Sequence, residues 1–528
     1  MRLHHHLARR AALGGMKTFL PLLSFLVTSL RSPLRGILRF AMLAVSLGSA
    51  LPSASAADRP NILLILTDDQ GWSTLSCYGS KKVPTPHLDS MAREGVRFTD
   101  AYVMPQCTPT RAALLTGQHT ARTGMWHVIP WYGSPWARMT EPAYREQLPR
   151  DWPTLPKVLR SAGYATGMAG KWHLTTGEDG DYVQLKAGDA HGFDFVAPRG
   201  QGSQNAGDKW VDHLTDSTIG FIRQPRDEPW FFYLAHHTLH GVVSAPEDLV
   251  RKHRQAGAPE SGMFDATYLA AIEHMDSSIG RLLGALDELK QRENTLVIFL
   301  SDNGGVDTTY LPPNLSGDPS DGSVPLKMKS QEFDSAPLRA GKGSPYEGGI
   351  RVPCLLRWPA RVKPAQVIET PVHVVDWMPT LLNLAGTSAP HEHPIDGVNL
   401  VPLLDGRGIP ERPLYFHMPL YDLRWCSTPC SVIREGPWKL IEHFGDSFED
   451  TFEGPRYRPG RKLELFHLPT DLGESRDISI TEEARADAMS AKLHAWLQSI
   501  PTPIPAQNPH FDPKRMLEET KEKQPWNR

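Results

Sequence analysis

Two pairs of oxygen-bearing side chains stand out because each pair directly follows an apolar run. Asp68 and Asp69 end one run, and Asp302 and Asn303 end another. Adjacent carboxylates repel each other unless a cation or a proton relieves the repulsion, and ligand sets made only of oxygens favour Ca²⁺ or Mg²⁺ over Zn²⁺. An isolated Asp-Asp pair would more simply cap a turn. Taken together, the two pairs predict a metal site for Ca²⁺, with Mg²⁺ as the alternative.

The apolar runs themselves predict strands. Residues 61–67, 230–235 and 295–301 are short and almost wholly apolar, which is typical of central strands buried on both faces. Residues 264–290 carry apolar side chains at helical spacing and predict an amphipathic helix packed on a sheet. Strands alternating with helices indicate an α/β fold with a doubly wound sheet flanked by helices. Ligands of such sheets bind beyond the carboxyl ends of the strands, so the two polar pairs should lie together.

The sequence pattern changes near residue 410. Short apolar segments separated by turn-rich stretches predict a small antiparallel sheet, over 414–417, 431–434, 438–442 and 463–468. A closing helix is predicted over 481–500, and its inner face should carry Ala488, Leu493, Trp496 and Leu497. We therefore expect a large α/β domain over 57–409, a smaller C-terminal α+β domain (antiparallel sheet plus helix) over 410–505, and an irregular tail over 506–528.

The N-terminal 56 residues differ from the rest of the chain. Their two apolar runs, 19–30 and 40–51, are each shorter than the roughly 20 residues that a membrane span needs. The second run follows basic residues and precedes Ala-Ser-Ala at 54–56, which is the order of a secretory signal peptide. We expect cleavage near Ala56, export to the periplasm or the medium, and no stable membrane span in the mature chain. An N-terminal membrane anchor is the alternative.

The composition of the 528-residue chain is that of a soluble globular protein, with 40% hydrophobic and 22% charged residues. The formal net charge of −3 lacks the basic excess that a phosphate backbone demands, which argues against nucleic acid as a partner. Five cysteines are an odd number for an exported chain, so at least one should be unpaired or chemically altered. Cys426 and Cys430 are close enough in sequence to bridge a short loop, although geometry would decide.

The sharpest local motif is Cys-Thr-Pro-Thr-Arg at residues 107–111, which leads into Leu-Thr-Gly at 115–117. Here the chain resembles the formylglycine-dependent sulfatases, an arylsulfatase-like family of the alkaline phosphatase superfamily, whose signature is Cys-x-Pro-x-Arg followed by Leu-Thr-Gly. Further blocks match that family in the same chain order, at residues 68–71, 170–173, 240, 302–304, 341–343 and 346–349. The resemblance runs from about residue 61 to the C-terminal sheet and implies an alkaline-phosphatase-like fold.

The resemblance also implies a chemistry. Cys107 would be converted to formylglycine (3-oxoalanine) by a separate maturation enzyme, and the hydrated aldehyde would attack the sulfur of an aryl or carbohydrate sulfate ester and release inorganic sulfate. The cation would be bound by Asp68, Asp69, Asp302 and Asn303, with the modified Cys107 as a further ligand.

The family's remaining site residues map onto basic side chains of this sequence. Arg111 would hold the diol, and Lys171 and Lys342 would neutralise the sulfate oxygens. His173 would take a proton during elimination, and His240 would protonate the departing alcohol. Where the family usually shows a Pro-His pair, this chain has three imidazoles, at 236, 237 and 240; alignment by the preceding strand favours His240.

The substrate is the least specified part of this hypothesis. A sulfated small molecule or glycan should be bound by four loops, over 126–138, 200–210, 308–335 and 423–429. Their tryptophans could stack on sugar or aryl rings or could equally be core residues: Trp126, Trp131, Trp136, Trp210 and Trp425. Two alternative functions remain open. One is a phosphodiester or phosphonate monoester hydrolase on the same scaffold, and the other is an inactive glycan-binding homologue in which Cys107 stays a thiol.

Overall fold

The structure is a computed structural model that describes residues 59–130, 133–175, 185, 191–201, 206–311, 326–451 and 453–520. The expected signal region over 1–56 and the last eight residues of the expected tail lie outside these residues. In this part of the chain, no helix combines the length and the apolar character that crossing a membrane requires.

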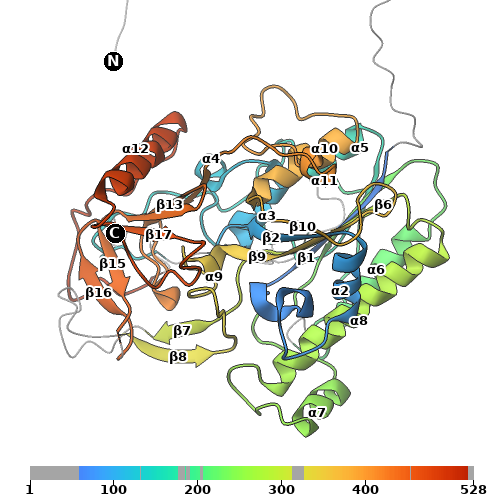
Figure 1. Ribbon diagram of the computed structural model, residues 1–528, viewed down its shortest axis with the longest axis horizontal. Helices are drawn as coiled ribbons and strands as arrows, with labels where there is room; N and C mark the ends of the chain where they lie inside the picture. Colours follow the sequence, from blue (N-terminus) through green and yellow to red (C-terminus); the bar gives the residue numbers. More distant parts are fainter. Residues whose placement is uncertain are drawn as a thin grey trace, which may run out of the picture. The chain divides into compact units, whose positions relative to one another are not determined.

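A mixed sheet forms the centre of the fold (Figure 1). Its strand order is β10 (Gln366–Ile368), β2 (Val96–Tyr102), β9 (Arg351–Arg357), β6 (Thr295–Ser301), β1 (Asn61–Thr67), β5 (Trp230–Ala235), β3 (Ala165–Gly170) and β4 (Phe195–Val196), and β11 (Val372–His373) also pairs with β2. β9 runs antiparallel to both of its neighbours, whereas β6, β1, β5, β3 and β4 are parallel. The three strands that the sequence predicts are confirmed as β1, β5 and β6 with the same bounds.

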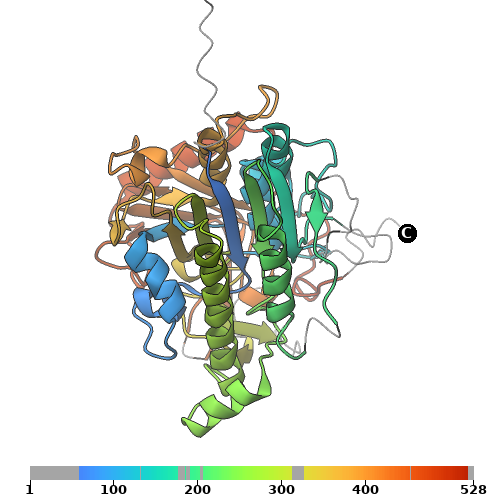
Figure 2. The same ribbon diagram turned by 90° about the vertical axis from the view of Figure 1, so that its right-hand side faces the viewer.

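Helices cover both faces of this sheet, as the doubly wound prediction requires. One face packs against α3 (Cys107–Thr116), α5 (Leu155–Ser161), α10 (Trp377–Leu384) and α11 (Val401–Leu404), and the other packs against α2 (Pro86–Glu94), α6 (Val211–Ile222) and α8 (Ala266–Glu288). Figure 2 shows the long α8 running along the second face. In β1, Leu64 and Leu66 face the first layer while Leu63 and Ile65 face the second, because successive side chains of a strand point to opposite sides. The uninterrupted apolar run follows from this burial on both faces.

A second sheet of four antiparallel strands follows in the C-terminal part: β12 (Leu414–Met418), β13 (Cys430–Glu435), β14 (Trp438–His443) and β17 (Lys462–His467). α12 (Glu483–Ser499) packs on it (Figure 1). The buried face of α12 carries Ala486, Met489, Leu493 and Leu497. The prediction of Ala488 on this face is wrong, because Ala488 is one residue out of the i, i+4 register of Met489, Leu493 and Leu497 and is exposed. The expected boundary at 409/410 falls between α11 and β12, and as a division into domains it stays a prediction.

Shorter elements connect these layers. They are α4 (Thr120–Thr123), α7 (Glu247–Gln255), α9 (Glu347–Ile350), the hairpin of β7 (Thr308–Leu311) and β8 (Lys327–Gln331), and the hairpin of β15 (Asp446–Glu449) and β16 (Arg456–Pro459).

All five cysteines are free thiols in the structure. The sequence spacing of Cys426 and Cys430 would allow a disulfide bridge, but the two residues pack in different apolar clusters. Cys430 begins β13 and faces the sheet core, whereas Cys426 ends a short helical turn with a left-handed backbone (φ 52°). The two sulfurs therefore do not meet.

Candidate active site

The carboxyl ends of four parallel strands bring the predicted residues together. Asp68 follows β1, Asp302 follows β6, Lys171 follows β3 and the histidine-rich segment 236–240 follows β5. Backbone hydrogen bonds continue the sheet into these ends: the amide of Asp302 donates to Thr67 O (3.0 Å), and the amide of Lys171 donates to Ala235 O (2.8 Å). The placement expected for a doubly wound sheet is therefore present.

The acidic residues form one buried cluster. An oxygen from each of Asp68, Asp69 and Asp302 and the sulfur of Cys107 lie within 4.8 Å of one another. Asn303 Nδ2 donates to Asp69 Oδ1 (2.8 Å), while Asn303 Oδ1 is buried and has no hydrogen-bond partner among the described residues. Burial, followed by the charge of Asp68, raises the pKa of Asp302 to about 6. Three carboxylates and an unsatisfied amide oxygen fit a hard divalent cation, which would satisfy that oxygen and relieve the repulsion.

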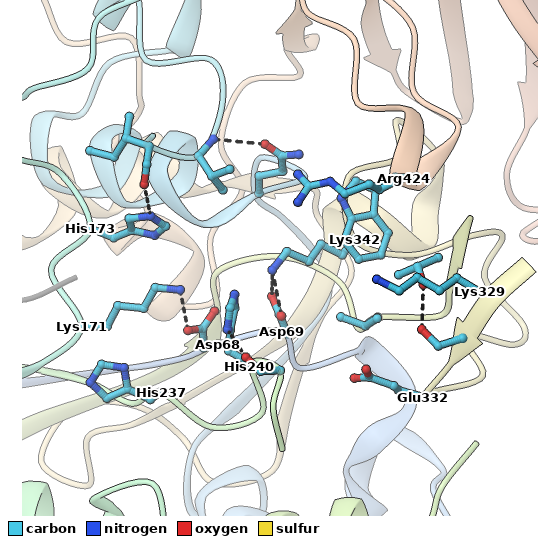
Figure 3. A pocket seen from close by; sticks show the side chains of 18 of the residues that line it. Asp68, Asp69, Lys171, His173, His237, His240, Lys329, Glu332, Lys342 and Arg424 are labelled. Atoms are coloured by element: carbon cyan, nitrogen blue, oxygen red, sulfur yellow. Dashed lines mark hydrogen bonds and ion pairs between the residues drawn. The ribbon is translucent and has the colours of Figure 1, made fainter. Parts of the chain in front are cut away.

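Three cations surround this cluster: Lys171 and Lys342, which are labelled in Figure 3, and Arg111, whose Nη2 lies 2.7 Å from Asp302 Oδ2. Lys171 Nζ lies 2.6 Å from Asp68 Oδ2, and Lys342 Nζ lies 2.7 Å from Asp69 Oδ1. Burial alone would raise the pKa of Asp68, but Lys171 and the other cations hold this pKa well below its usual range. Both lysines are almost fully buried and remain charged because each faces a carboxylate.

Cys107 is fully buried at the start of α3. Its Sγ lies 3.4 Å from Asp68 Oδ1. Burial, followed by the charge of Asp302, raises the pKa of the Cys107 thiol, so the unmodified side chain is a poor nucleophile at neutral pH. The start of α3 is held by Thr110, whose Oγ1 accepts from Met104 N and donates to Met104 O (both 3.0 Å), and by Thr108 Oγ1, which donates to His173 O (2.9 Å).

The histidines occupy different positions. His173 has a left-handed backbone (φ 57°), and its Nε2 donates to Ile129 O (2.8 Å). A ring nitrogen of His240 lies within 4.8 Å of Cys107 Sγ and an oxygen of Asp68, while its Nδ1 bonds to Gly241 O (2.8 Å). His237 also lines the cavity, whereas His236 is fully buried and does not line it. The structure thus leaves two imidazoles after β5, His237 and His240, that face the site.

A cavity of about 710 Å³ opens onto this site (Figure 3). The site residues that line it are Asp68, Asp69, Lys171, His173, His237, His240 and Lys342, whereas Cys107, Asp302 and Asn303 are fully buried and are not among its lining residues. All four loops that the sequence predicts around the site contribute to the cavity wall. Loop 126–138 contributes Val128, Ile129 and Pro130, and loop 200–210 contributes Lys209. Loop 308–335 contributes Thr309, Tyr310, Lys329, Ser330 and Glu332, and loop 423–429 contributes Arg424 and Trp425. Gln106 and Glu519 line the cavity as well. No motif marks Lys209, Glu332 or Glu519, and Glu519 falls in the segment expected to be an irregular tail.

Of the tryptophans considered for stacking on a substrate ring, Trp425 lines the cavity. Trp126 and Trp210 are only 5% and 6% exposed and pack in apolar clusters, so for these two the stacking interpretation is wrong. Trp136 is covered by the guanidinium of Arg515, 3.3 Å from its ring centre. Trp131 lies outside the described residues.

Comparison with known proteins identifies this arrangement. The family model described as Sulfatase matches residues 60–387, which include every residue of the cluster and its surrounding cations. The chain belongs to the sulfatase family. A second model, described as N-sulphoglucosamine sulphohydrolase, C-terminal, matches residues 341–499 of this sulfatase. The enzyme class expected from the sequence, a hydrolase of sulfate esters, is thereby confirmed.

Individual relatives span most of this sulfatase. Arylsulfatase A of Homo sapiens is 32% identical over 494 residues, covering 84% of this chain and 87% of the relative. N-acetylgalactosamine-6-sulfatase of Canis lupus familiaris is 28% identical, covering 90% and 92%. The crystal structure of the PsFucS1 sulfatase from Pseudoalteromonas sp. has a TM-score of 0.63 at 22% identity and covers 89% of this chain and 96% of its own, which supports the shared fold.

Proposed function

We propose that this sulfatase acts through a formylglycine at position 107. The observation that carries the proposal is the place of Cys107, fully buried against Asp68 and surrounded by cations, with a raised pKa that disfavours the thiolate. A thiol in that place has no evident use as a nucleophile, whereas an aldehyde made from it does. The hydrated aldehyde supplies a geminal diol, of which one oxygen can attack sulfur and the other can later expel the sulfate.

We also propose that Asp68, Asp69, Asp302 and Asn303, with the modified residue 107, bind Ca²⁺, or alternatively Mg²⁺. The unsatisfied Asn303 Oδ1 and the raised pKa of Asp302 support this assignment. When bound, the cation supplies positive charge that favours ionisation of a neighbouring hydroxyl and screens the sulfate.

We carry over the remaining roles from the sulfatase resemblance, and the positions of these residues around the cluster support them. Arg111 holds the diol from α3, and Lys171 and Lys342 neutralise sulfate oxygens as charge develops. His173 removes a proton during elimination, and His240 donates a proton to the departing oxygen. Burial, together with the charges of Lys171 and Lys342, lowers the pKa of His240 to about 4. The negative charge of a sulfate bound by the two lysines offsets the part of this lowering that the lysines cause.

The substrate that we propose is an aryl or carbohydrate sulfate. Relatives named for aryl sulfates and for N-acetylgalactosamine 6-sulfate support both possibilities, and the cavity of about 710 Å³ has room for a saccharide unit beyond the sulfate. We further propose that the chain is exported after cleavage near Ala56 and that a maturation enzyme oxidises Cys107.

The test combines mass spectrometry with turnover. Protein produced together with a formylglycine-generating enzyme should show an aldehyde or its hydrate in the peptide that contains residue 107, and it should release sulfate from 4-nitrophenyl sulfate. Cys107→Ala should be inactive, whereas Cys77→Ala, outside the site, should retain activity. An active preparation with an unmodified thiol at 107 would contradict the mechanism, and faster hydrolysis of matched phosphonate esters would favour the alternative reaction.

A further inference from the structure

Lys209 is a buried cation in the cavity wall that the proposed mechanism does not use. It is only 1% exposed and lines the cavity together with Lys171 and His237. Its Nζ donates to the carbonyl oxygen of Val242 (2.9 Å), and no carboxylate of the described residues lies within ion-pair distance of it. An ammonium group buried with one neutral partner is costly unless an anion approaches it. Among the described residues no other partner meets this ammonium group, so two of its three N–H donors can bind such an anion.

The backbone around Lys209 is fixed in an uncommon conformation. Lys209 (φ 54°) and Trp210 (φ 63°) are consecutive left-handed residues directly before α6. Asp208 holds the turn by accepting from Trp210 N (3.0 Å) and Asp212 N (2.9 Å), and the Trp210 indole donates to Gln201 O (2.9 Å). Left-handed conformations in non-glycine residues cluster at binding and catalytic sites, where the surrounding structure maintains them.

A ring nitrogen without a partner among the described residues lies beside Lys209. His237 is 4% exposed, lines the same cavity, and packs edge-on against Trp210 with ring centres 5.7 Å apart. Its Nε2 is buried and has no hydrogen-bond partner among the described residues. Buried polar atoms are normally satisfied, so an unsatisfied ring nitrogen and a buried ammonium group in one wall point to a ligand.

We propose that Lys209, with His237 beside it, binds a second anionic group of the substrate, a carboxylate or a second sulfate on the alcohol that departs. This inference rests on the proposed function. The sulfate that is cleaved already has Lys171 and Lys342, each of which faces a carboxylate of the metal cluster. Lys209 instead contacts the backbone two residues after His240, the proposed acid for the departing oxygen. Its partner therefore belongs to the leaving group.

The charge state of Lys209 agrees with this role. Burial lowers its pKa to about 8, while Asp68 opposes the shift. Most molecules thus carry the positive charge at neutral pH. Hydrogen bonds to charged groups contribute enough to change a binding or rate constant by about 10- to 100-fold.

The experiment compares substrates that differ only in the second anion. Positional isomers of hexose monosulfates would be measured against the matching hexuronic acid monosulfates and hexose disulfates, with 4-nitrophenyl sulfate as the substrate that lacks a second anion. We expect the second anion to raise kcat/KM of the wild type by about 10- to 100-fold for at least one isomer. The carboxylate and sulfate series show which of the two anions is bound.

Variants at position 209 test the residue itself. Lys209→Gln should remove the preference for the second anion and leave turnover of 4-nitrophenyl sulfate within about threefold, and Lys209→Arg should keep much of the preference. The inference is overturned if the wild type shows no preference, if Lys209→Gln keeps it, or if that variant loses activity equally on all substrates. The absence of a preference in the wild type would overturn the inference even if Lys209→Gln does not fold. Turnover of 4-nitrophenyl sulfate without a preference would refute this inference alone, whereas no turnover of any sulfate ester would refute the proposed function.

Discussion

Arg111 donates from Nε and Nη2 to the same oxygen of Asp302, at 3.1 and 2.7 Å, and both side chains are fully buried. Arg111 lies on the first turns of α3, which carries Cys107, and Asp302 follows β6. Arg111 Nη1 also donates to Lys171 O (2.9 Å), at the end of β3. One guanidinium therefore joins the helix of the proposed nucleophile to two strand ends of the site.

Removing this guanidinium should destabilise the protein strongly. Arg111→Met leaves the Asp302 carboxylate buried without its partner, and breaking a buried ion pair on one side typically costs about 3–5 kcal/mol. Urea denaturation of metal-free protein would measure the loss. Arg223→Met removes the exposed pair with Glu288 and should cost no more than about 1 kcal/mol. Equal losses in the two variants would show that Arg111 does not stabilise the site.

Removing the metal should abolish turnover. Treatment with a chelator should stop sulfate release, and Ca²⁺ or Mg²⁺ should restore it better than Zn²⁺, because all the protein side chains assigned to the metal offer oxygens. Asn303→Ala should lower both the metal content and the rise in Tm on adding Ca²⁺, since it deletes the unsatisfied Oδ1. Asn383→Ala, at an exposed position, is the control. Full metal content in the Asn303 variant would place the site elsewhere.

Stability should depend on pH through Asp446, which is fully buried in β15 and accepts hydrogen bonds from Tyr421 (2.8 Å) and Tyr457 (3.0 Å). Burial raises its pKa to about 6, against about 3.9 in an unfolded chain. Between these values the folded state binds a proton that the unfolded state does not, so the free energy of unfolding falls by about 1.4 kcal/mol per pH unit as pH rises.

The comparison that isolates Asp446 uses Asp446→Asn. Relative to this variant, the wild type should gain stability as pH falls from about 6.5 to about 4.5, measured by urea denaturation at several pH values. Asp487→Asn, on the exposed side of α12, controls for the loss of one acidic residue. A difference between wild type and Asp446→Asn that is constant with pH would contradict the raised pKa.

The strands and the acidic cluster could be predicted because they depend on local sequence. An apolar run buried on both faces is visible as a run, as in β1, and polar residues directly after it must lie at the sheet edge. The antiparallel direction of β9 could not be predicted, since the strand has no pattern that records its direction. The same holds for Lys209 and Glu519, which reach the cavity through turns and tertiary packing that no periodicity encodes.

The tryptophans illustrate a second limit of prediction from the sequence. Trp210 and Trp425 have equally plausible places in predicted loops, but Trp210 is buried beneath the cavity wall whereas Trp425 lies in it. Gly343 permits this, because its missing side chain leaves room for the Trp425 ring beside Lys342. Such a contact joins segments about 80 residues apart and depends on how the C-terminal part packs on the sheet.

The last prediction concerns which imidazole protonates the departing oxygen. A ring nitrogen of His240 lies within 4.8 Å of Cys107 Sγ and an Asp68 oxygen. Because Nδ1 donates to Gly241 O, Nε2 is the ring nitrogen that can donate a proton to the departing oxygen. Proton donation matters most for strongly basic leaving groups. His240→Ala should therefore slow the hydrolysis of sugar sulfates by about 10²- to 10⁴-fold and affect 4-nitrophenyl sulfate far less. The ratio of kcat/KM for the two substrates is the measurement.

The neighbouring imidazoles provide matched controls. His236→Ala should leave this ratio unchanged, since His236 is buried away from the cavity. His237→Ala should change the discrimination between singly and doubly anionic substrates but not the ratio, because His237 is assigned to the second anion rather than to the departing oxygen. Equal losses on both substrates in His240→Ala would indicate sulfate binding or a structural role. A selective loss in His237→Ala would transfer the acid to His237, whose unsatisfied Nε2 faces the same cavity.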